Sequence, residues 1–294
     1  MNNIWILSKS SDKVYENRRL LETFSSKNIS ATLVHPNEFD LIVDKNNLTN
    51  VWRSGFQVKM PDAVLVRTGS GSSYFALAVL RQLETIGIPV INTSISITTV
   101  KDKLETMQLL GKNGISIPKT MLVRWPINEQ LVNDQIGWPC VLKVITGSGG
   151  RGVYLCHDAT SFDKIMQLIK NLDTKKTMII QEYIGHRVGT DLRVWVVGGN
   201  VIGAMQRTSA NDFRANISNG GTGLIHVITP EIECIAKETA RILDLDIAGV
   251  DLLFDVDGFK VCEANSSPGF EGFETYCGQD MATAVVDYVI SRMK

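Results

Sequence analysis

The sequence predicts a parallel α/β layer at the front of the chain, followed by an antiparallel α+β region. Within residues 1–96, apolar strand segments alternate with amphipathic helical segments, which is typical of a parallel sheet. Further along, two strands are joined directly by the turn Gly198-Gly199-Asn200, which indicates an antiparallel hairpin. With 294 residues, 44% of them hydrophobic, the chain is long enough for about two domains with buried cores.

The front elements follow from hydrophobic periodicity. We predict a buried strand at residues 4–7 and a helix at 14–24, because Leu20, Leu21 and Phe24 share one helical face. The layer is completed by a strand at 31–34, a small hairpin at 51–58 around Ser54-Gly55, an apolar strand at 63–66, a helix at 74–83 and a strand at 89–91.

After Asn92 the pattern changes. A charged helix is expected at 101–112, ended by Gly114, and an extended segment begins at Ile117-Pro118. The other expected elements are strands at 140–145, 153–156 and 178–183, a helix at 162–169, a hairpin of 192–197 with 201–205, a helix at 232–243, a hairpin at 249–265 and a helix at 281–293. We therefore place three domains at 1–96, 97–178 and 179–294.

Charge and composition exclude several classes of function. Thirty basic and 31 acidic residues give a net charge of −1, so no global field favours nucleic acid or an anionic membrane. The apolar run in MNNIWILSKSSDK is too short for a signal peptide, and no apolar stretch is long enough to span a bilayer. The five cysteines are scattered without a CxxC pair, which favours reduced thiols. We expect a cytoplasmic protein that binds neither nucleic acid nor membrane.

The segment GVDLLFDVDGFKVCEANSSPGF carries the clearest chemical signal. It places Asp251 and Glu263 on two short apolar strands, with Asn265 two residues further on. Three hard oxygen donors on adjacent strands suit Mg²⁺ ions that also hold nucleotide phosphates. Two solvent-facing acids on an ordinary hairpin are the alternative that this stretch alone leaves open.

The register of this hairpin decides whether a metal site forms. A two-residue turn at 257–258 would put the two acids on opposite faces of the sheet. We expect instead a three-residue loop at 256–258 with Gly258 at positive φ, which only glycine adopts cheaply. Such a loop pairs Asp255 with Phe259 and sets the two acids directly opposite each other, with the asparagine on the same face.

A glycine loop and a strand lysine indicate a phosphate site. The loop GSGGRG matches GxGxxG, but a strand follows it, so we reject a dinucleotide-binding fold. The backbone N–H groups of Gly149, Gly150 and Gly152 are suited to phosphates, with an ordinary flexible loop as the alternative. Lys143 lies in the apolar strand VLKVI and needs an anionic partner, either a protein acid or a phosphate. Lys103, judged by itself, is a surface residue.

Four arginines form a basic cluster: Arg187, Arg193, Arg207 and Arg214. Arg193 and Arg207 lie on the two strands of one expected hairpin and point the same way as Asp191. Arginine forks bind carboxylates and phosphates through two hydrogen bonds. For any single member, a solvated strand arginine is the alternative.

The turn RTGSGSS, residues 67–73, follows a buried strand and leads into a helix. Ligands of open α/β sheets bind at the carboxyl ends of strands, and helix N-termini favour anions. This turn is our candidate for a substrate carboxylate, with a plain strand-to-helix turn as the alternative. The four histidines show no ligand spacing, and we assign them no chemistry.

Taken in order, KDKLETMQLL, VLKV, GSGGRG, QEYI, DLRVWVVGG, DFRAN, GVDLL and EANSSPGFEG resemble the motifs of ATP-grasp ligases, and more narrowly of RimK-type α-L-glutamate ligases. The similarity covers essentially the whole chain. It implies an ATP-grasp fold with an N-terminal parallel α/β (pre-ATP-grasp) domain. It also implies a carboxylate–amine ligase that forms an amide through an acyl phosphate.

The resemblance implies roles for individual residues. Lys103 and Lys143 would contact ATP phosphates, Glu182 and Tyr183 the adenine edge, Asp191 the ribose, and Arg214 with Asn216 the phosphate and metal side. Asp251, Glu263 and Asn265 would ligate two Mg²⁺ or Mn²⁺ ions. We expect Arg193, Arg207 and Arg214 to serve catalysis, and Arg67, Thr68 and Ser267 to hold substrate.

One departure concerns the acceptor. The family's phosphate loop is usually closer to VEGTQGIG, whereas ITGSGGRG adds Arg151 and leans toward the lysine- and arginine-biosynthesis ligases that modify a carrier protein. The expected substrates are L-glutamate and a carboxylate on a peptide, protein tail or small molecule, and a homo-oligomer stays open. The alternatives are a carrier-protein ligase adding another amino acid, a kinase-like phosphotransferase and a non-catalytic ATP-binding regulator. The presence of both lysines and all three metal ligands argues against a decayed site.

Overall fold

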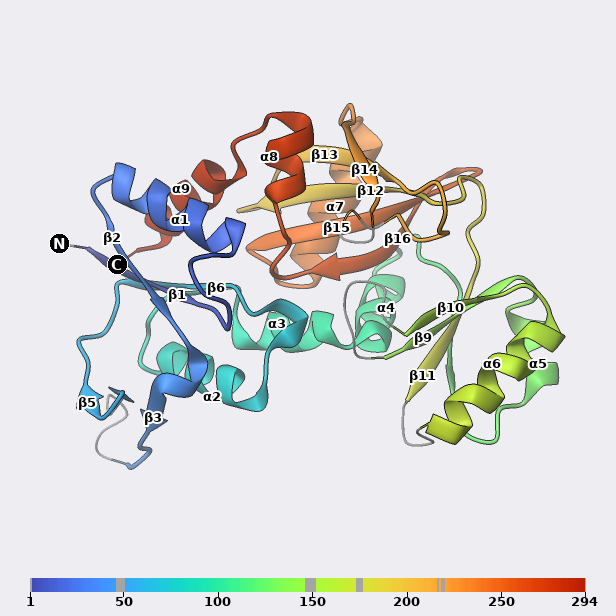
Figure 1. Ribbon diagram of the computed structural model, residues 1–294, viewed down its shortest axis with the longest axis horizontal. Coiled ribbons are helices and arrows are strands. Elements are labelled where there is room, and N and C mark those ends of the chain that lie inside the picture. The colour runs from blue at the N-terminus through green and yellow to red at the C-terminus, as the bar shows by residue number, and fades with distance from the viewer. Residues whose placement is uncertain are drawn as a thin grey trace.

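A computed structural model describes residues 2–45, 51–145, 152–172, 177–215, 217 and 220–293. The N-terminal sheet is parallel, in the order β2-β1-β6-β7, as the sequence predicted. Its strands are β1 (Asn3–Leu7), β2 (Ser30–Val34), β6 (Ala63–Val66) and β7 (Val90–Ile91). Figure 1 shows α1 (Tyr15–Ser26) and α9 (Met281–Arg292) on one side of this sheet and α2 (Tyr74–Thr85) on the other.

Alternation along β1 explains the two faces of this sheet. Ile4 and Ile6 join the core formed with α1 and α9, whereas Trp5 and Leu7 join the core under α2. All four side chains are at most 3% exposed. Burying an aliphatic side chain of this size stabilises a fold by roughly 1.5–3 kcal/mol. The last helix, α9, therefore packs against the N-terminal sheet, and both chain termini lie beside this sheet (Figure 1).

Two short helices, α3 (Ser94–Lys101) and α4 (Lys103–Lys112), replace the single helix expected from residue 101. They are separated at Asp102, which has extended backbone angles. Its Oδ1 accepts the N–H groups of Leu104 at 2.9 Å and Glu105 at 3.1 Å. An aspartate N-cap of this kind starts a helix, so the expected boundary was wrong and α3 was missed.

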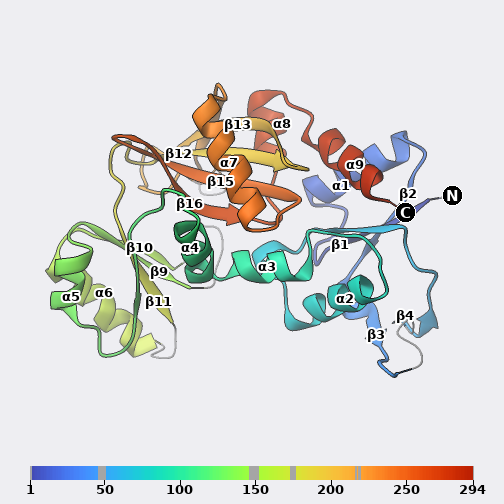
Figure 2. The same ribbon diagram turned by 180° about the vertical axis from the view of Figure 1, so that it is seen from behind.

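The central lobe is a small antiparallel sheet, in the order β10-β9-β11-β8. Its strands are β8 (Thr120–Val123), β9 (Cys140–Val144), β10 (Val153–Cys156) and β11 (Met178–Glu182), covered by α5 (Glu129–Gln135) and α6 (Ala159–Leu172). Figure 2 shows both helices on the same side of the sheet. Leu142, Phe162 and Met166 belong to a core that this lobe does not share with the rest of the described chain.

The C-terminal lobe is an antiparallel sheet, in the order β14-β13-β12-β15-β16. Its strands are β12 (Thr190–Val197), β13 (Asn200–Thr208), β14 (Thr222–Ile225), β15 (Ile247–Asp255) and β16 (Gly258–Asn265). One face packs against α4 and α7 (Pro230–Ile242), and the other against α8 (Glu271–Cys277) and α9. Strand β14 and helix α8 were not expected from the sequence.

A small three-stranded antiparallel sheet, in the order β3-β4-β5, and two 3-10 turns complete the described elements. They are η1 (Pro36–Glu38), β3 (Phe39–Leu41), β4 (Val51–Arg53), β5 (Phe56–Gln57) and η2 (Gly69–Gly71). Ser54 and Gly55 both have positive φ, which confirms the hairpin turn expected there. None of the described helices is long and apolar enough to cross a membrane.

Candidate active site

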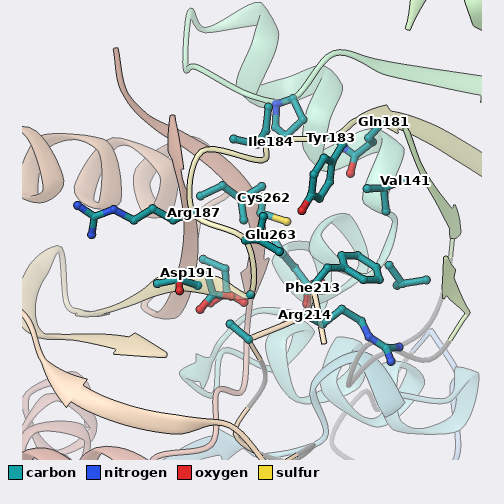
Figure 3. Close-up of a pocket in the computed structure, with 18 of the residues that line it drawn as sticks. Val141, Gln181, Tyr183, Ile184, Arg187, Asp191, Phe213, Arg214, Cys262 and Glu263 are labelled. Atoms are coloured by element: carbon teal, nitrogen blue, oxygen red, sulfur yellow. The ribbon is translucent and has the colours of Figure 1, made fainter. Parts of the chain in front are cut away.

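One pocket lies between the central and C-terminal lobes, and we call it the inter-lobe pocket (Figure 3). The central lobe contributes Val141 and Lys143 from β9, while the C-terminal lobe contributes Asp191, Arg207 and Asp251 from its strands. Each lobe therefore supplies one wall of the pocket, and both walls carry charged groups.

A second pocket, the front pocket, lies between the N-terminal domain and the C-terminal lobe. Arg67 and Thr68 line it from the end of β6, and Ser267 lines it from the segment after β16. Lys103 and Glu263 line both pockets. The two cavities therefore meet at Lys103, a predicted phosphate contact, and Glu263, a predicted metal ligand.

A ladder of ion pairs crosses the C-terminal sheet beside this junction. Arg207 lies opposite Asp191 and donates to both of its oxygens, at 2.7 and 2.6 Å. Arg193 lies opposite Asp251 and does the same at 2.7 and 2.6 Å. A further contact of 3.0 Å joins Arg207 to Asp251 Oδ2. The expectation that Arg193, Arg207 and Asp191 point the same way is therefore confirmed, and both arginines have carboxylate partners.

The ladder determines how its acids ionise. Burial would raise the pKa of Asp251, but Arg193 and Arg207 outweigh it and hold that pKa below its usual range. For Asp191, burial is the larger effect and its pKa is raised despite Arg207. Asp251 is thus kept as a carboxylate, which is the form that ligates a cation.

The acids of the β15–β16 hairpin face each other, but not for the expected reason. Asp251 pairs with Glu263, and Gly258 has a φ of 116°. However, the turn has two residues, since Asp255 pairs with Gly258 rather than with Phe259. The expected three-residue loop was wrong.

A β-bulge at Cys262 accounts for the observed register. Leu252 pairs with Val261 while Asp251 pairs with Glu263, so Cys262 is the extra residue between them. An added residue shifts the register by one position, so the side chains that follow it on the strand point to the opposite face of the sheet. Val261 therefore pairs with Leu252, and Leu253 pairs with Lys260.

The donors at the proposed metal site are oxygen atoms. Asp251 Oδ1 accepts one arginine N–H and Oδ2 accepts two, which leaves about one of four lone-pair positions. Among the described residues, no lysine or arginine forms an ion pair with Glu263. Asn265 lies on the same face, and with its amide turned it donates to Glu263 Oε1 at 3.0 Å and accepts from Arg193 Nη2 at 3.1 Å.

These donors fit Mg²⁺ or Mn²⁺ shared with a phosphate ligand. In the described ranges no group of three or more His, Cys, Asp or Glu is arranged to hold a metal. Two carboxylates and one amide oxygen supply too few ligands by themselves for an octahedral ion. Hard cations of this kind commonly take the remaining positions from substrate phosphates and water.

The predicted phosphate lysines, Lys103 and Lys143, both line the inter-lobe pocket. Lys103 is the first residue of α4, and its backbone N–H reaches Ile145 O at 3.5 Å. Lys143 Nζ lies 3.5 Å from Cys262 Sγ, the thiol of the bulge residue. Burial raises the pKa of that thiol although Lys143 opposes the shift. The sequence pattern did not predict that Cys262 lies beside Lys143, because the direction of its side chain depends on the bulge.

The loop over the predicted phosphate site is described only at its end. Gly149, Gly150 and Asn216 lie outside the described residues. Gly152 has a φ of 71°, and a Cβ there would come within 2.9 Å of Val144. Glycine is therefore required at the point where the loop joins β10.

The predicted adenine residues, Glu182 and Tyr183, line the inter-lobe pocket. Glu182 Oε1 accepts from Lys260 Nζ at 2.6 Å and from the backbone N–H of Lys119 at 2.9 Å. Tyr183 meets Phe213 edge-on with ring centres 6.4 Å apart. Both rings line the pocket, and Figure 3 shows them beside Val141. The arrangement provides an aromatic and aliphatic slot suited to a planar base.

The other predicted cations differ in their surroundings. Arg214 pairs with Asp212 at 2.6 Å while lining the inter-lobe pocket. Arg187 stacks over Phe254 at 4.3 Å from the ring centre, and Figure 3 shows it extending away from the other labelled side chains. Arg67 Nη1 donates to Pro268 O at 3.0 Å, and its Nε is buried without a hydrogen-bond partner. Burial lowers the pKa of Arg67, which Glu16 opposes.

The remaining predicted substrate residues flank this arginine. Thr68 Oγ1 lies 2.5 Å from Ser72 Oγ, so the turn is closed by its own hydroxyl groups. Gly69 has a φ of 49°, and a Cβ there would lie 3.2 Å from Ser267 Cβ. The turn after β6 therefore touches the segment after β16 at the wall of the front pocket. Glu16 and Lys101 also line this pocket and were not predicted.

Comparison with known families assigns the chain. Residues 2–97 match the RimK PreATP-grasp domain, and residues 100–289 match the RimK-like ATP-grasp domain. The chain belongs to the RimK-like ATP-grasp family. The resemblance expected from the motifs is confirmed, and so is the fold class, an ATP-grasp fold with an N-terminal parallel α/β domain.

Curated relatives of this RimK-like chain are similar over nearly their whole length. A probable alpha-L-glutamate ligase of Vibrio cholerae is 35% identical over 288 residues, covering 97% of this chain and 94% of the relative. Probable alpha-L-glutamate ligase 1 of Shewanella amazonensis is 33% identical with the same coverage.

Solved structures share the ATP-grasp fold. The ATP-grasp ligase PsnB, complexed with a phosphomimetic variant of minimal precursor, Mg and ADP, has a TM-score of 0.76 at 19% identity, covering 100% of this chain and 99% of that one. The RimK domain protein ATP-grasp from Sphaerobacter thermophilus has a TM-score of 0.75 at 21% identity, covering 98% and 99%. D-alanine–D-alanine ligase from Bacillus anthracis has a TM-score of 0.68 at 17% identity, covering 99% and 97%.

Proposed function

We propose that this protein is an ATP-dependent carboxylate–amine ligase that adds L-glutamate to an acceptor carboxylate. The observation that carries the proposal is the meeting of two pockets at Lys103 and Glu263. A ligase of this class needs a nucleotide site and a substrate site joined where phosphate is transferred. Membership of the RimK-like family and the names of the curated relatives support glutamate as the added amino acid.

In this proposal ATP occupies the inter-lobe pocket. Tyr183 and Phe213 hold the base, with Glu182 at its edge and Asp191 on the ribose side. Lys103, Lys143 and the glycine loop neutralise the phosphates. Asp251, Glu263 and Asn265 hold two divalent ions, Mg²⁺ or Mn²⁺, which supply Lewis-acid stabilisation of phosphate charge when bound.

The arginine ladder positions Asp251 in this proposal. Because Arg193 and Arg207 already donate to carboxylates, they orient the ligand and keep it ionised rather than contacting the transferred group themselves. Arg214 lines the pocket and is the member of the predicted catalytic set placed to approach phosphate. Losing one partner of such a buried pair leaves an uncompensated charge, which costs roughly 3–5 kcal/mol.

The reaction itself needs positioning and charge neutralisation. The acceptor carboxylate attacks the γ-phosphorus of ATP, the bond to the β-phosphate oxygen breaks, and an acyl phosphate and ADP form. The amine of glutamate then attacks the acyl carbon, and phosphate leaves as the amide forms. Arg67, Thr68 and Ser267 hold a substrate carboxylate in the front pocket, within reach of the junction. Closure of the lobes excludes water that would hydrolyse the acyl phosphate.

An ADP-release assay tests the proposal. Purified protein is given ATP, Mg²⁺ or Mn²⁺, each amino acid in turn, and acceptors that include a peptide, a small dicarboxylic acid and a carrier-protein tail. We expect ADP release that requires both substrates, with mass spectrometry showing the acceptor mass increased by one or more glutamyl units. Transfer of a different amino acid to the carrier tail would favour the carrier-protein alternative. Amide formation at an undiminished rate in excess chelator would refute the metal-dependent mechanism.

A further inference from the structure

The front pocket carries an excess of cationic groups. Arg67, Lys101 and Lys103 line it, against two acids, Glu16 and Glu263. Lys103 and Glu263 lie at the junction with the inter-lobe pocket, so they belong to the side where phosphate is transferred. The other two cations lie toward the N-terminal domain, one at the end of β6 and one at the end of α3. Figures 1 and 2 show α3 between the N-terminal sheet and α4.

Neither of these two cations has an acidic partner among the described residues. Arg67 donates to the carbonyl of Pro268 at 3.0 Å, and its Nε has no partner. Lys101 Nζ donates to the carbonyl of Ser72 at 2.7 Å, which leaves two of its three N–H groups for other acceptors. A neutral carbonyl satisfies a hydrogen bond but does not neutralise the charge, so both groups can bind an anion.

The nearby acid is already used for another purpose. Glu16 Oε1 accepts the backbone N–H of Phe270 at 3.0 Å and that of Glu271 at 3.4 Å, where α8 begins. It therefore supports a helix start, and it forms no ion pair with Arg67 or Lys101 in the described part of the chain. Glu16 keeps its negative charge and acts on Arg67 through space, but no described carboxylate contacts either cation directly. Both cations therefore keep donors that an incoming carboxylate can meet.

We propose that Lys101 is a specificity-determining residue that binds the second carboxylate of a dicarboxylic amino acid, while Arg67 binds the first. This inference rests on the proposed function, because it places the amino-acid substrate in the front pocket. Two separate cations match an α-carboxylate and a side-chain carboxylate, and they leave the amine to face the junction at Glu263. A neutral side-chain amide in the second position would leave the charge of Lys101 uncompensated, so the site selects the acid over its amide.

Binding of L-glutamate and L-glutamine to the full chain, in the presence of ADP and Mg²⁺, tests this assignment. Isothermal titration is carried out on the wild type, Lys101→Met and Lys9→Met. Methionine keeps an apolar stem and removes the charge. Lys9 is the matched control because its Nζ donates to Gly71 O at 2.5 Å, in the same turn, and it does not line the pocket.

We expect the wild type and Lys9→Met to bind glutamate at least tenfold more tightly than glutamine. In Lys101→Met this preference should fall below threefold, with glutamine and ADP affinities unchanged. An equal loss for both amino acids would show that Lys101 only holds the turn, and a retained preference would show that another group reads the side chain. Either result overturns the assignment, as does a wild type with no preference. The titration measures binding without amide formation. Selective binding of glutamate by a protein that forms no amide in the ADP-release assay would therefore overturn the proposed function but not the assignment of Lys101.

Discussion

At the scale of single residues, the candidate site contains two kinds of cation. Arg193 and Arg207 are held by carboxylates at 2.6–2.7 Å and have little capacity for a ligand. Lys143 has a thiol neighbour at 3.5 Å, a weak acceptor that does not satisfy an ammonium group. The anionic partner inferred from a lysine in an apolar strand is not supplied by any ion pair among the described residues, which supports the proposed contact with an ATP phosphate.

Lys143→Met tests this role. Because a hydrogen bond to a charged group contributes roughly 1.5–3 kcal/mol, we expect kcat/KM for ATP to fall by roughly 10- to 100-fold. The fold should be retained, since methionine keeps the apolar stem between β10 and β11. Steady-state kinetics and circular dichroism measure both effects. Lys164→Met, on the exposed face of α6, is the control, and wild-type kinetics in Lys143→Met would assign the lysine to structure.

Arg67→Met addresses the substrate side. The guanidinium makes one hydrogen bond to Pro268 O, so most of its donors are free for a carboxylate. We expect the KM for one carboxylate substrate to rise at least tenfold while the KM for ATP changes less than twofold. Arg81→Met, where the guanidinium stacks on Tyr74 at 5.6 Å on the exposed side of α2, should leave both constants unchanged. A parallel loss of ATP affinity would place Arg67 in the nucleotide site.

Residue-level predictions succeeded where they depended on alternation along one strand. Asp191 and Arg193 are two positions apart, so their common face follows from the sequence alone. The pairing of Arg193 with Asp251 could not be predicted, because it depends on which strand lies beside β12. Cys262 and Lys101 were missed for a similar reason: the tertiary fold places them in the pockets, and their neighbours in the chain carry no signal.

At the scale of elements, the β15–β16 hairpin shows two routes to the same register. The sequence predicted the facing acids through a three-residue loop, whereas the structure combines a two-residue turn with a bulge at Cys262. Glycine and aspartate in a sequence indicate where a turn lies, but no residue type indicates a bulge within an apolar strand. The α3–α4 break at Asp102 was equally hidden, since a capping aspartate also occurs inside charged helices.

Gly258→Ala tests the turn separately from the acids. Gly258 has a φ of 116°, which a residue with a Cβ adopts at a cost of roughly 1–3 kcal/mol. We expect urea denaturation to show a loss of that size, while kcat at saturating substrates stays within twofold because the bulge sets the register of Asp251 and Glu263. Val256→Ala, in the same turn and 77% exposed, should change stability by less than about 0.5 kcal/mol. A large fall in kcat in a stable Gly258→Ala protein would show that the turn, not the bulge, positions the acids.

At the scale of the whole molecule, the cores are not divided as the three expected domains are. Side chains of the N-terminal sheet, α9 and one face of the C-terminal sheet form a common core, which includes Ile6, Trp195 and Val285. The central lobe has a separate core around Leu142 and Phe162. The parallel and antiparallel halves were predictable from the spacing of strands and helices. The return of α9 to the first sheet was not, because its apolar face would suit any layer of the protein.

The separate core of the central lobe gives a prediction about motion. The lobe contacts the rest of the molecule across the inter-lobe pocket through groups such as Lys143 with Cys262 and Glu182 with Lys260. A partly exposed ion pair of this kind contributes only about 0–1 kcal/mol, so the lobe should unfold as a separate unit more readily than the common core does. Without nucleotide, we expect hydrogen exchange at the amides of β9 and β11 to be faster than at those of β12 and β15.

Nucleotide should slow hydrogen exchange in the central lobe if it binds between the lobes. At an ATP concentration of about 100 times Kd, with Mg²⁺, a ligand that binds only while the central lobe is folded stabilises that lobe by about 2.7 kcal/mol, which slows exchange through its unfolding roughly 100-fold. Mass-detected exchange should show the slowing in β9 and β11 and little change in β1 and β6. In Lys143→Met the same ATP concentration should protect the central lobe less, because the contact from β9 to phosphate is missing. Equal protection of all three sheets, or protection confined to the N-terminal sheet, would place the nucleotide elsewhere.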